Sequence, residues 1–458
     1  MFRIVHAEKQ DDFAGYSDMR TEPPLALLAP PEVRRRVIFV NRYFYPDISA
    51  TSQMLTDLAR SLSAAGNYEL HVICSRRLYA DQMARLASAG EWHGVQIHRC
   101  WSAHLGQHRL FWRALDYLCF FISSTVAMMR WARRGDILVA MTDPPLISVC
   151  AALVAKIRGA KLVNWLQDIF PEVATVLNIR IPGWMTRNLQ RARTWSLHAA
   201  EKNVVLGYRM QQLVSGLGVL AGKQRVIENW ADGRAINPRS ALDSALRSSL
   251  GAPNSFIVQY SGNLGRAHEI LTILGAATRL RDEAGWLFLF VGGGANMKVL
   301  QAAAERSQLT NMRFVPYQPR ELLADCLSAA DAHLTCLLPA MEGLVMPSKF
   351  YGILAAGRPV IIIGDPDGEQ ARVVRAEGCG VIIERGDSKA LVDELRRMRA
   401  DPEWMRGAAQ GARVLFERRY TLQRAAMQWS QLLENLVTED TARLTPEVLE
   451  RDGAVHET

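Results

Sequence analysis

The sequence predicts an α/β protein made of two doubly wound, Rossmann-like domains that face a cleft. The chain has 458 residues, more than one hydrophobic core normally accommodates. Short runs rich in β-branched residues alternate with stretches of helical periodicity, which is typical of a parallel sheet covered by helices on both faces. A segment rich in Ser, Ala, Pro and Gly interrupts this alternation at 231–254, and the alternation then restarts.

The expected elements follow the same order in both halves of the chain. Strands before the break are expected at 35–41, 69–74, 95–100, 137–141, 161–167, 203–206 and 225–228. Helices before it are expected at about 52–64, 108–133, 146–157, 183–199 and 208–217. Strands after the break are expected at 256–260, 286–291, 312–315, 333–338, 360–363 and 381–384. Helices after it are expected at about 267–282, 296–308, 319–329, 348–356, 388–400, 402–418 and 421–438.

These elements divide the chain into five parts. Residues 1–34 contain two Pro pairs and no periodicity, so we expect a disordered extension. The first domain is expected at 35–235 and the second at 236–415. A C-terminal helix at 416–440 is expected to pack back across the domains, and a polar tail follows at 441–458.

Composition limits the classes of function. The net charge of +8 favours anionic partners such as nucleotides, lipid phosphates or nucleic acid. The seven cysteines show no CxxC or similar ligand spacing, which indicates reduced, buried thiols and a cytosolic setting. The histidines form no HExxH motif, and the HxxxH pair His104 and His108 lies in an expected loop, so we predict no metal site. We also expect neither a membrane span nor a signal peptide.

One basic and aromatic segment, 109–134, allows two interpretations. Its apolar centre is short, Asp116 interrupts it, and arginines together with Trp112 and Trp131 flank it. This pattern fits a helix that lies on an anionic membrane surface. It fits equally well a buried crossover helix between two strands.

The stretch 342–361, EGLVMPSKFYGILAAGRPVI, combines a helix start with charged residues. Ser348 is expected to be the N-cap hydroxyl of a short helix that ends at a left-handed Gly357. The helix start and Lys349 suit a phosphate, and Glu342 can hold a sugar hydroxyl. A tight structural turn with surface charges is the alternative.

Three strand ends in the second half are suited to a nucleotide. A glycine-containing loop with a cation, Arg266, follows the first of these strands. The second strand ends in three glycines that leave room for a ring or ribose, and the third ends at Val315 and Tyr317, where the aromatic ring can lie against a base. Each loop alone is typical of an ordinary turn, but together on one sheet edge they favour a binding site. The residues concerned are Gly262, Gly265, Arg266, Gly292, Gly293, Gly294, Val315 and Tyr317.

In the first half, Asp168 ends an apolar strand and is expected to point into the cleft. A carboxylate there can orient or deprotonate an acceptor hydroxyl. An Asp this close to a Pro is also typical of a helix cap or turn. Glu172 and Glu201 are weaker candidates for the same role.

The order of these motifs resembles the retaining glycosyltransferases of family 4, which have the GT-B fold. The resemblance extends from 35 to about 435 and is greatest to the WcaI-like colanic-acid branch that builds exopolysaccharides. The motifs that carry it are YFYPDISATS at 43–52, TDPPL at 142–146, WLQDIFPE at 165–172, ENWAD at 228–232, YSGNLG at 260–265 and PSKFYGILAAGRPVI at 347–361.

The resemblance implies that the second domain holds the diphosphate of a nucleotide-sugar donor. The family's usual arginine falls on Asn263, so Arg266 or His268 must replace it, with Lys349 a further candidate beside Ser348. The second glutamate of the family's pair falls on Gly352, which leaves Glu342 as the expected sugar contact.

The resemblance places the acceptor in the first domain. The paired glycines of the family's first loop are replaced here, and the expected acceptor-side residues are Tyr45, Ser49, Thr51 and Ser52. Asp168 and Glu342 are the expected catalytic residues.

The implied reaction is a retaining, metal-independent transfer of a hexosyl group that needs no cofactor beyond the donor. The implied acceptor is a saccharide on a polyprenyl diphosphate, which favours the membrane-surface interpretation of 109–134. We therefore expect a cytoplasmic protein, peripheral on the inner membrane face, that binds no nucleic acid. Alternatives are a catalytically degenerate GT-B binding module, a GT-B epimerase or a phosphorylase.

Overall fold

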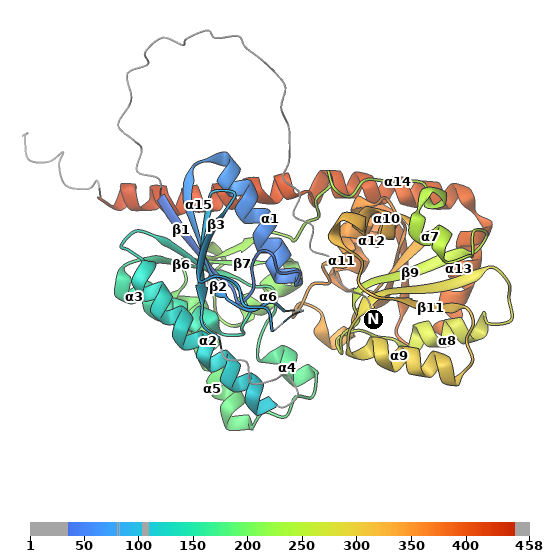
Figure 1. Ribbon diagram of the computed structural model, residues 1–458, viewed down its shortest axis with the longest axis horizontal. Helices are drawn as coiled ribbons and strands as arrows, with labels where there is room; N and C mark the ends of the chain where they lie inside the picture. Colours follow the sequence, from blue (N-terminus) through green and yellow to red (C-terminus); the bar gives the residue numbers. More distant parts are fainter. Residues whose placement is uncertain (1–34, 80, 82, 103–109, 445–458) are drawn as a thin grey trace, which may run out of the picture. The chain divides into compact units, whose positions relative to one another are not determined.

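The computed structural model describes residues 35–79, 81, 83–102 and 110–444, and in this part of the chain it contains two β-sheets (Figure 1). The predicted disordered extension at 1–34 lies outside the described residues, as does most of the predicted polar tail. The predicted α/β class with two parallel-sheet domains is confirmed.

The first sheet has eight strands in the order β3-β4-β2-β1-β5-β6-β7-β8. All neighbouring strands are parallel except β3 and β4, which pair antiparallel. The bounds are β1 (Arg35–Val40), β2 (Tyr68–Ser75), β3 (Ala89–Trp92), β4 (Val95–Cys100), β5 (Ile137–Ala140), β6 (Lys161–Trp165), β7 (Lys202–Val205) and β8 (Gln224–Val226).

The second sheet has six strands, all parallel, in the order β11-β10-β9-β12-β13-β14. The bounds are β9 (Phe256–Asn263), β10 (Trp286–Gly293), β11 (Met312–Val315), β12 (Ala332–Cys336), β13 (Val360–Gly364) and β14 (Gly380–Glu384).

Helices connect the strands and cover both sheets. The bounds are α1 (Ala50–Ala65), α2 (Leu110–Trp131), α3 (Ile147–Arg158), α4 (Glu172–Val176), α5 (Gly183–Ala199), α6 (Tyr208–Gly216), α7 (Ala245–Ser249), α8 (Leu271–Arg279), α9 (Ala295–Arg306), α10 (Leu323–Ser328), α11 (Lys349–Ala355), α12 (Glu369–Glu377), α13 (Ser388–Ala400), α14 (Pro402–Arg419) and α15 (Leu422–Leu444).

Side chains that alternate along β1 show how both faces of the first sheet are buried. Val37 and Phe39 belong to a core that includes α1, α6 and α15, whereas Ile38 and Val40 belong to a core that includes α2 and α3. Successive side chains of a strand point to opposite faces, so an unbroken apolar run requires helices on both sides. Figure 1 shows α1 and α15 on one side of this sheet and α2 and α3 on the other.

Every predicted strand is present, and the structure adds β3, which the sequence did not indicate. The segment Ala89–Trp92 reads AGEW, with no β-branched residue and no apolar alternation, and three of its four residues are exposed. It is a strand because it pairs with β4 at the sheet edge, so tertiary pairing overrides a weak local preference.

The C-terminal helix α15 follows the second sheet in sequence but packs on the first. Its Trp429 lies 4.8 Å from the ring of Trp165, which in turn stacks on Trp230 at 5.9 Å. All three indoles are almost fully buried. The chain therefore returns to the first sheet before residue 444.

Loops of the two sheets also touch directly. The Ile169 amide donates to the Leu344 carbonyl at 2.9 Å, and Asp168 pairs antiparallel with Val345. The Arg320 guanidinium pairs with the buried carboxylate of Asp57 at 2.7 Å. The contacts of Asp168 and Ile169 thus bring the loop after β6 against the 342–346 loop, and the Arg320–Asp57 pair is a second link between the two halves.

Helix α2 has features of both interpretations of the 109–134 segment. Phe120, Ser124 and Met128 are fully buried against the sheet, as in a crossover helix. Leu118, Ile122 and Val126, one turn apart on another side of the helix, are more than half exposed. Among the described residues, no helix is both long enough and apolar enough to span a bilayer.

Candidate functional site

Lys349 lies between the end of β9 and the start of α11, where the sequence predicted a phosphate site. Its ammonium lies 4.0 Å from the centre of the Tyr260 ring and donates a hydrogen bond to the Tyr260 hydroxyl. Burial lowers the pKa of Lys349 to about 8. The ammonium is thus still protonated at neutral pH, beside Gly262, in surroundings with little water.

Ser348 occupies the expected position, but its predicted capping hydrogen bond is wrong. The residue has helical backbone angles, φ −67° and ψ −23°, and its hydroxyl caps no backbone amide. An N-cap side chain reaches the next turn only from an extended backbone, which explains the difference. The left-handed conformation predicted for Gly357 is confirmed, with φ +60°.

His268 is a neutral side chain in this site. Its Nδ1 lies 2.6 Å from the Cys336 carbonyl oxygen. Burial and the neighbouring Lys349 charge lower the pKa of His268 to about 3. It therefore adds no positive charge at neutral pH, in contrast to the expectation that it can replace the missing arginine. Arg266 and Asn263 are exposed in the same loop.

The glycines at the ends of β9 and β10 allow close packing of two strand ends. A Cβ on Gly292, whose φ is +129°, would lie 2.3 Å from the Gly262 carbonyl oxygen. A Cβ on Gly293 would lie 3.1 Å from the ring of Tyr317. The expected room for a ring or ribose above these glycines is therefore filled by the neighbouring strand end and by Tyr317.

Tyr317 itself follows β11 and Val315, and its side chain is about half exposed, at 53%. One side of its ring rests on the two glycines. Among the described aromatic residues at these three strand ends, Tyr317 is the most exposed.

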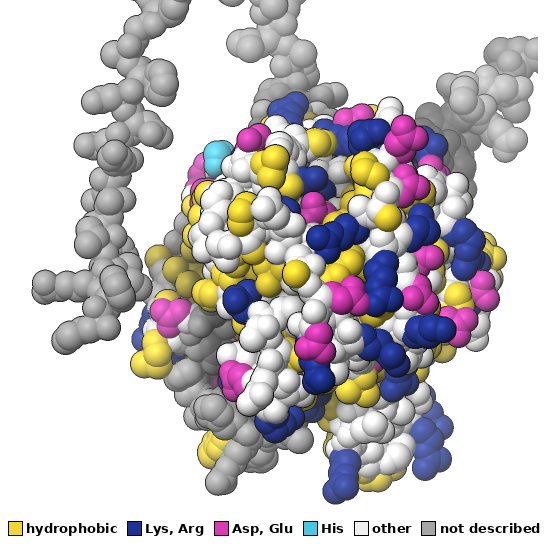
Figure 2. Space-filling view, turned by 90° about the vertical axis from the view of Figure 1, so that its right-hand side faces the viewer, with side chains coloured by type: hydrophobic (Ala, Val, Ile, Leu, Met, Phe, Trp, Pro, Cys, Tyr) yellow, Lys and Arg dark blue, Asp and Glu magenta, His cyan; other side chains and the backbone are white. Residues whose placement is uncertain are grey.

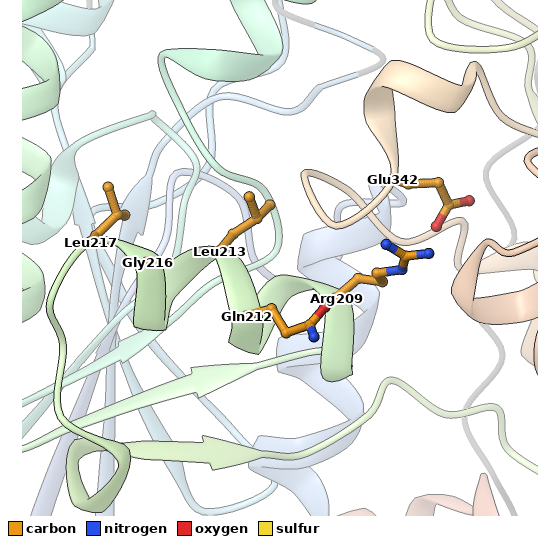
Figure 3. A pocket seen from close by; sticks show the side chains of 6 residues that line it. All are labelled: Arg209, Gln212, Leu213, Gly216, Leu217 and Glu342. Carbon is orange, nitrogen blue, oxygen red and sulfur yellow. The ribbon is translucent and has the colours of Figure 1, made fainter.

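Glu342 lies at the rim of an open pocket of about 420 Å³ (Figure 3). Its Oε2 accepts a hydrogen bond from the Glu369 amide at 3.2 Å. Burial, together with nearby Asp365 and Glu369, raises the pKa of Glu342, and Arg209 opposes this shift. In Figure 3 the Arg209 guanidinium points toward the Glu342 carboxylate.

Glu369 is a residue that sequence reasoning missed. Its two carboxylate oxygens accept from the amides of Tyr208 and Arg209, at 2.6 and 2.8 Å, where α6 begins. The Arg209 guanidinium donates in return to the Asp367 carbonyl at 2.8 Å. The only signal in the sequence was an acidic residue after Gly368, which indicates a helix start but not this partner.

Asp168 and Asp143 form a second polar centre, at the carboxyl edge of the first sheet. Burial raises the pKa of Asp168 to about 7; the Asp143 carboxylate adds to the shift and the Thr142 hydroxyl opposes it. Burial also raises the pKa of Asp143 to about 6, against the attraction of Arg42. The Asp168 Oδ1 is buried without a hydrogen-bond partner among the described residues. Asp143 was not predicted as a site residue, although it belongs to the quoted TDPPL motif.

The four expected acceptor-side residues differ in exposure. Tyr45 is 41% exposed and stacks on Trp92 of the unexpected strand β3, with ring centres 4.6 Å apart. Ser52 is fully buried, and its hydroxyl donates to the Asp47 carbonyl, so it holds the loop and is out of reach of an acceptor. The Thr51 hydroxyl accepts from Asn41, and the Ser49 hydroxyl is buried with no partner in the part of the chain that the structure describes.

Metal-ligating side chains are not gathered in the described part of the chain. No group of three or more His, Cys, Asp or Glu side chains converges there. The seven cysteines are free thiols.

Residues 244–414 match the family described as "Glycosyl transferases group 1". The two sheets match solved glycosyltransferase structures over most of the chain. The protein is therefore a glycosyltransferase with the GT-B fold.

Two bacterial glycosyltransferases are similar to this chain in sequence. The putative colanic acid biosynthesis glycosyl transferase WcaI of Escherichia coli is 27% identical over 368 residues, which cover 77% of this chain and 89% of WcaI. The probable glycosyltransferase WbjE of Pseudomonas aeruginosa is 27% identical over 293 residues, which cover 63% of this chain and 73% of WbjE.

Solved structures share the fold at lower identity. Sucrose-phosphate synthase of Thermosynechococcus elongatus has a TM-score of 0.73 at 17% identity and covers 89% of this chain and 100% of its own. HepE of Anabaena, in complex with UDP-glucose, has a TM-score of 0.66 at 17% identity and covers 87% of this chain and 99% of its own.

Proposed function

We propose that the protein transfers a hexosyl group from a nucleotide-diphosphate sugar to a saccharide acceptor in exopolysaccharide assembly. The observation that carries the proposal is the ammonium of the part-buried Lys349 between Tyr260 and Gly262, at the strand ends of the second sheet. A cation in a poorly hydrated site stabilises a departing diphosphate more strongly than a cation in water does. In this proposal the enzyme is a retaining member of family 4 and needs no metal.

The proposed donor site combines the ends of β9, β10 and β11 with α11. Lys349 and Arg266 neutralise the diphosphate, and the exposed side of the Tyr317 ring holds the base. The remaining contacts come from Gly262, Asn263, Gly265, Gly294, Val315 and Ser348, whereas Gly292 and Gly293 support Tyr317 from below. His268 supports Lys349 as a neutral neighbour.

The proposed reaction passes through an oxocarbenium-like transition state on one face of the donor sugar. The leaving diphosphate takes the acceptor proton, and the protein positions the groups and stabilises charge. Glu342 contacts the donor sugar, and Asp168 orients the acceptor hydroxyl.

Two similarities support a uridine nucleotide and a polysaccharide product. WcaI is named for colanic acid biosynthesis. HepE has been solved with UDP and with UDP-glucose. UDP-sugars are therefore the first donors to test.

A thermal-shift panel of nucleoside diphosphates and nucleotide sugars tests the donor. A ligand that binds only the folded state raises the unfolding temperature by mass action. We expect UDP and one UDP-sugar to stabilise the protein and that sugar to be transferred to an exopolysaccharide precursor. Stabilisation without transfer would instead indicate a degenerate binding module. The presence of Gly352 at the position of the family's second glutamate favours that alternative.

Nucleic acid is not among the proposed partners. Figure 2 shows one face of the molecule, on which Lys and Arg side chains alternate with Asp and Glu. A nucleic-acid surface needs clustered positive charge.

The acceptor is proposed to be a saccharide on a polyprenyl diphosphate, reached from the inner face of the membrane. Two neighbouring helices expose apolar side chains in addition to those of α2. On α3 these are Leu153 and Ile157, and on α5 they are Trp184 and Trp195. Helices α3 and α5 contain no Asp or Glu, and the acid of α2, Asp116, is buried. The exposed cations on and beside these helices are Arg130, Arg133, Arg134, Lys156, Arg158, Arg187 and Arg191. Apolar side chains surrounded by cations favour binding to an anionic lipid surface.

Replacing Ile122 and Val126 together with glutamine is expected to weaken binding to vesicles of phosphatidylglycerol. The change removes apolar contact with the lipid but leaves the charges in place. Cosedimentation measures it, with Leu271→Gln on the equally exposed surface of α8 as the control. Equal binding of the double variant and the control would contradict the membrane proposal.

A further inference from the structure

Arg42 is a positioned cation at the first sheet that neither the predicted site nor the family resemblance included. It lies two residues after the end of β1, and its backbone is held on both sides. The Arg42 amide donates to the Asp143 carbonyl at 2.6 Å, and the Arg42 carbonyl accepts from the Ser75 amide at 2.8 Å. The residue is thus fixed at the carboxyl edge, beside the ends of β2 and β5.

Two tyrosine rings hold the Arg42 side chain. Its guanidinium carbon lies 5.3 Å from the centre of the Tyr43 ring and 4.8 Å from that of Tyr117. Tyr43 is buried, and Tyr117 comes from α2. Aromatic faces position a guanidinium without using its N–H donors.

The hydrogen-bond donors of this side chain are unused by the described residues. The Arg42 Nε is buried and has no partner, and no described carboxylate lies within ion-pair distance of the guanidinium. Two other arginines near this edge do use side-chain donors on described residues, although the Arg99 Nε is also buried without a partner among them. Arg76 donates to the Leu86 carbonyl at 2.9 Å, and Arg99 donates to the Tyr45 carbonyl at 3.2 Å.

Leaving buried donors unpaired costs free energy, so a ligand that accepts from them binds with a matching advantage. The neighbours of Arg42 indicate which ligand. Asp143 adjoins it and in turn acts on Asp168, which is proposed to orient the acceptor hydroxyl. Tyr117 connects Arg42 to α2, whose apolar side is exposed. A planar guanidinium in this position suits the paired oxygens of a phosphate or carboxylate.

We propose that Arg42 is an oxyanion subsite for the acceptor, which binds a phosphate or carboxylate oxygen pair close to the acceptor hydroxyl. The inference rests on the proposed function, since it assigns a subsite to the same acceptor. A lipid-linked diphosphate and an acidic sugar both present this chemistry. Arg42 then selects charged over neutral acceptors and leaves donor binding unaffected.

The test uses the full chain saturated with UDP, so that the donor diphosphate site is filled. Farnesyl diphosphate serves as a phosphate probe, glucuronate as a carboxylate probe, and farnesol and glucose as their neutral counterparts. Calorimetric titration compares the unchanged protein with Arg42→Gln, Arg42→Lys and the exposed control Arg281→Gln. We expect at least one charged probe to bind about tenfold more weakly to Arg42→Gln, with a smaller loss for Arg42→Lys. Neutral probes are expected to show no dependence on residue 42.

The alternative role for Arg42 is a structural counter-charge for Asp143. The double variant Arg42→Gln, Asp143→Asn separates the two roles, because it restores the local charge balance without restoring the guanidinium. Recovery of probe binding in the double variant would overturn the proposal, as would equal binding of charged probes to Arg42→Gln and to the control. Continued weak binding in the double variant supports it. Failure of UDP itself to stabilise any variant or the unchanged protein would count against the proposed donor function instead.

Discussion

Replacing Lys349 with methionine is expected to weaken binding of the nucleotide-sugar donor by about 10- to 100-fold, because one charge-assisted contact to the diphosphate is lost. Methionine keeps most of the side-chain volume between Tyr260 and Gly262 but removes the ammonium. Calorimetric titration with UDP measures the effect directly. Lys298→Met, at an exposed position on α9, is the matched control.

The pH dependence of donor binding is a second test of the role of Lys349. The pKa of Lys349 in the folded protein is about 8, below the usual value of a lysine. Donor affinity is therefore expected to fall as the pH rises through that value, and this fall is expected to be absent in Lys349→Met.

The stability of the unliganded protein is expected to change in the opposite direction. A lowered lysine pKa means that the protonated form destabilises the folded state below about pH 8. Lys349→Met is expected to raise the unfolding temperature at pH 7 while it weakens UDP binding. A variant that loses stability and affinity together would indicate a packing role and contradict the assignment of Lys349 to the diphosphate.

Replacing Asp168 with asparagine is expected to lower the rate of sugar transfer by about 100-fold, the size of effect expected when a group that orients the acceptor hydroxyl is lost. In the proposed mechanism the carboxylate orients the acceptor hydroxyl only when it is ionised. Because burial raises the pKa of Asp168 to about 7, the rate is expected to increase with pH through that value. Asparagine has no such titration, so the remaining rate is expected to be flat in this range.

Donor binding and stability serve as controls for Asp168→Asn. A raised carboxyl pKa means that ionisation destabilises the folded state, so this contribution to unfolding free energy falls as the pH rises from about 4 to 7. The asparagine variant is therefore expected to be at least as stable as the unchanged protein at pH 8 and to bind UDP equally well. Unchanged transfer rates with an unchanged pH profile would exclude a role for Asp168 in the reaction.

Local sequence determined the elements that carry the two sites. Continuous apolar strands such as 256–260 and 286–291 need helices on both faces, and this local rule fixes the α/β class. The strand ends of the second sheet were predictable for the same reason, since parallel strands deliver their following loops to one edge. Lys349 was predictable as a cation after a Pro-Ser helix start.

Local sequence failed where a side chain's role depends on a distant partner. His268 was predicted as a possible replacement for the missing arginine, yet burial and the neighbouring Lys349 charge make it neutral, with its Nδ1 against the Cys336 carbonyl. The glycines at the end of β10, Gly292 and Gly293, were predicted to leave open space, yet Tyr317 and Gly262 fill it. Ser348 has the residue type of a cap but not the backbone angles.

The sequence by itself thus determined the class, most of the strands and helices in their order, and most of the residues of the proposed donor site, but it did not indicate β3, α4, α7 or α12. Only the tertiary structure decided the charge state and partners of those residues. It placed Lys349 on Tyr260, Asp168 against Val345, and Arg42 between a ring from the loop after β1 and a ring from α2. The physical reason is that strand and helix preferences depend on neighbours along the chain, whereas burial and electrostatic interactions depend on neighbours in space.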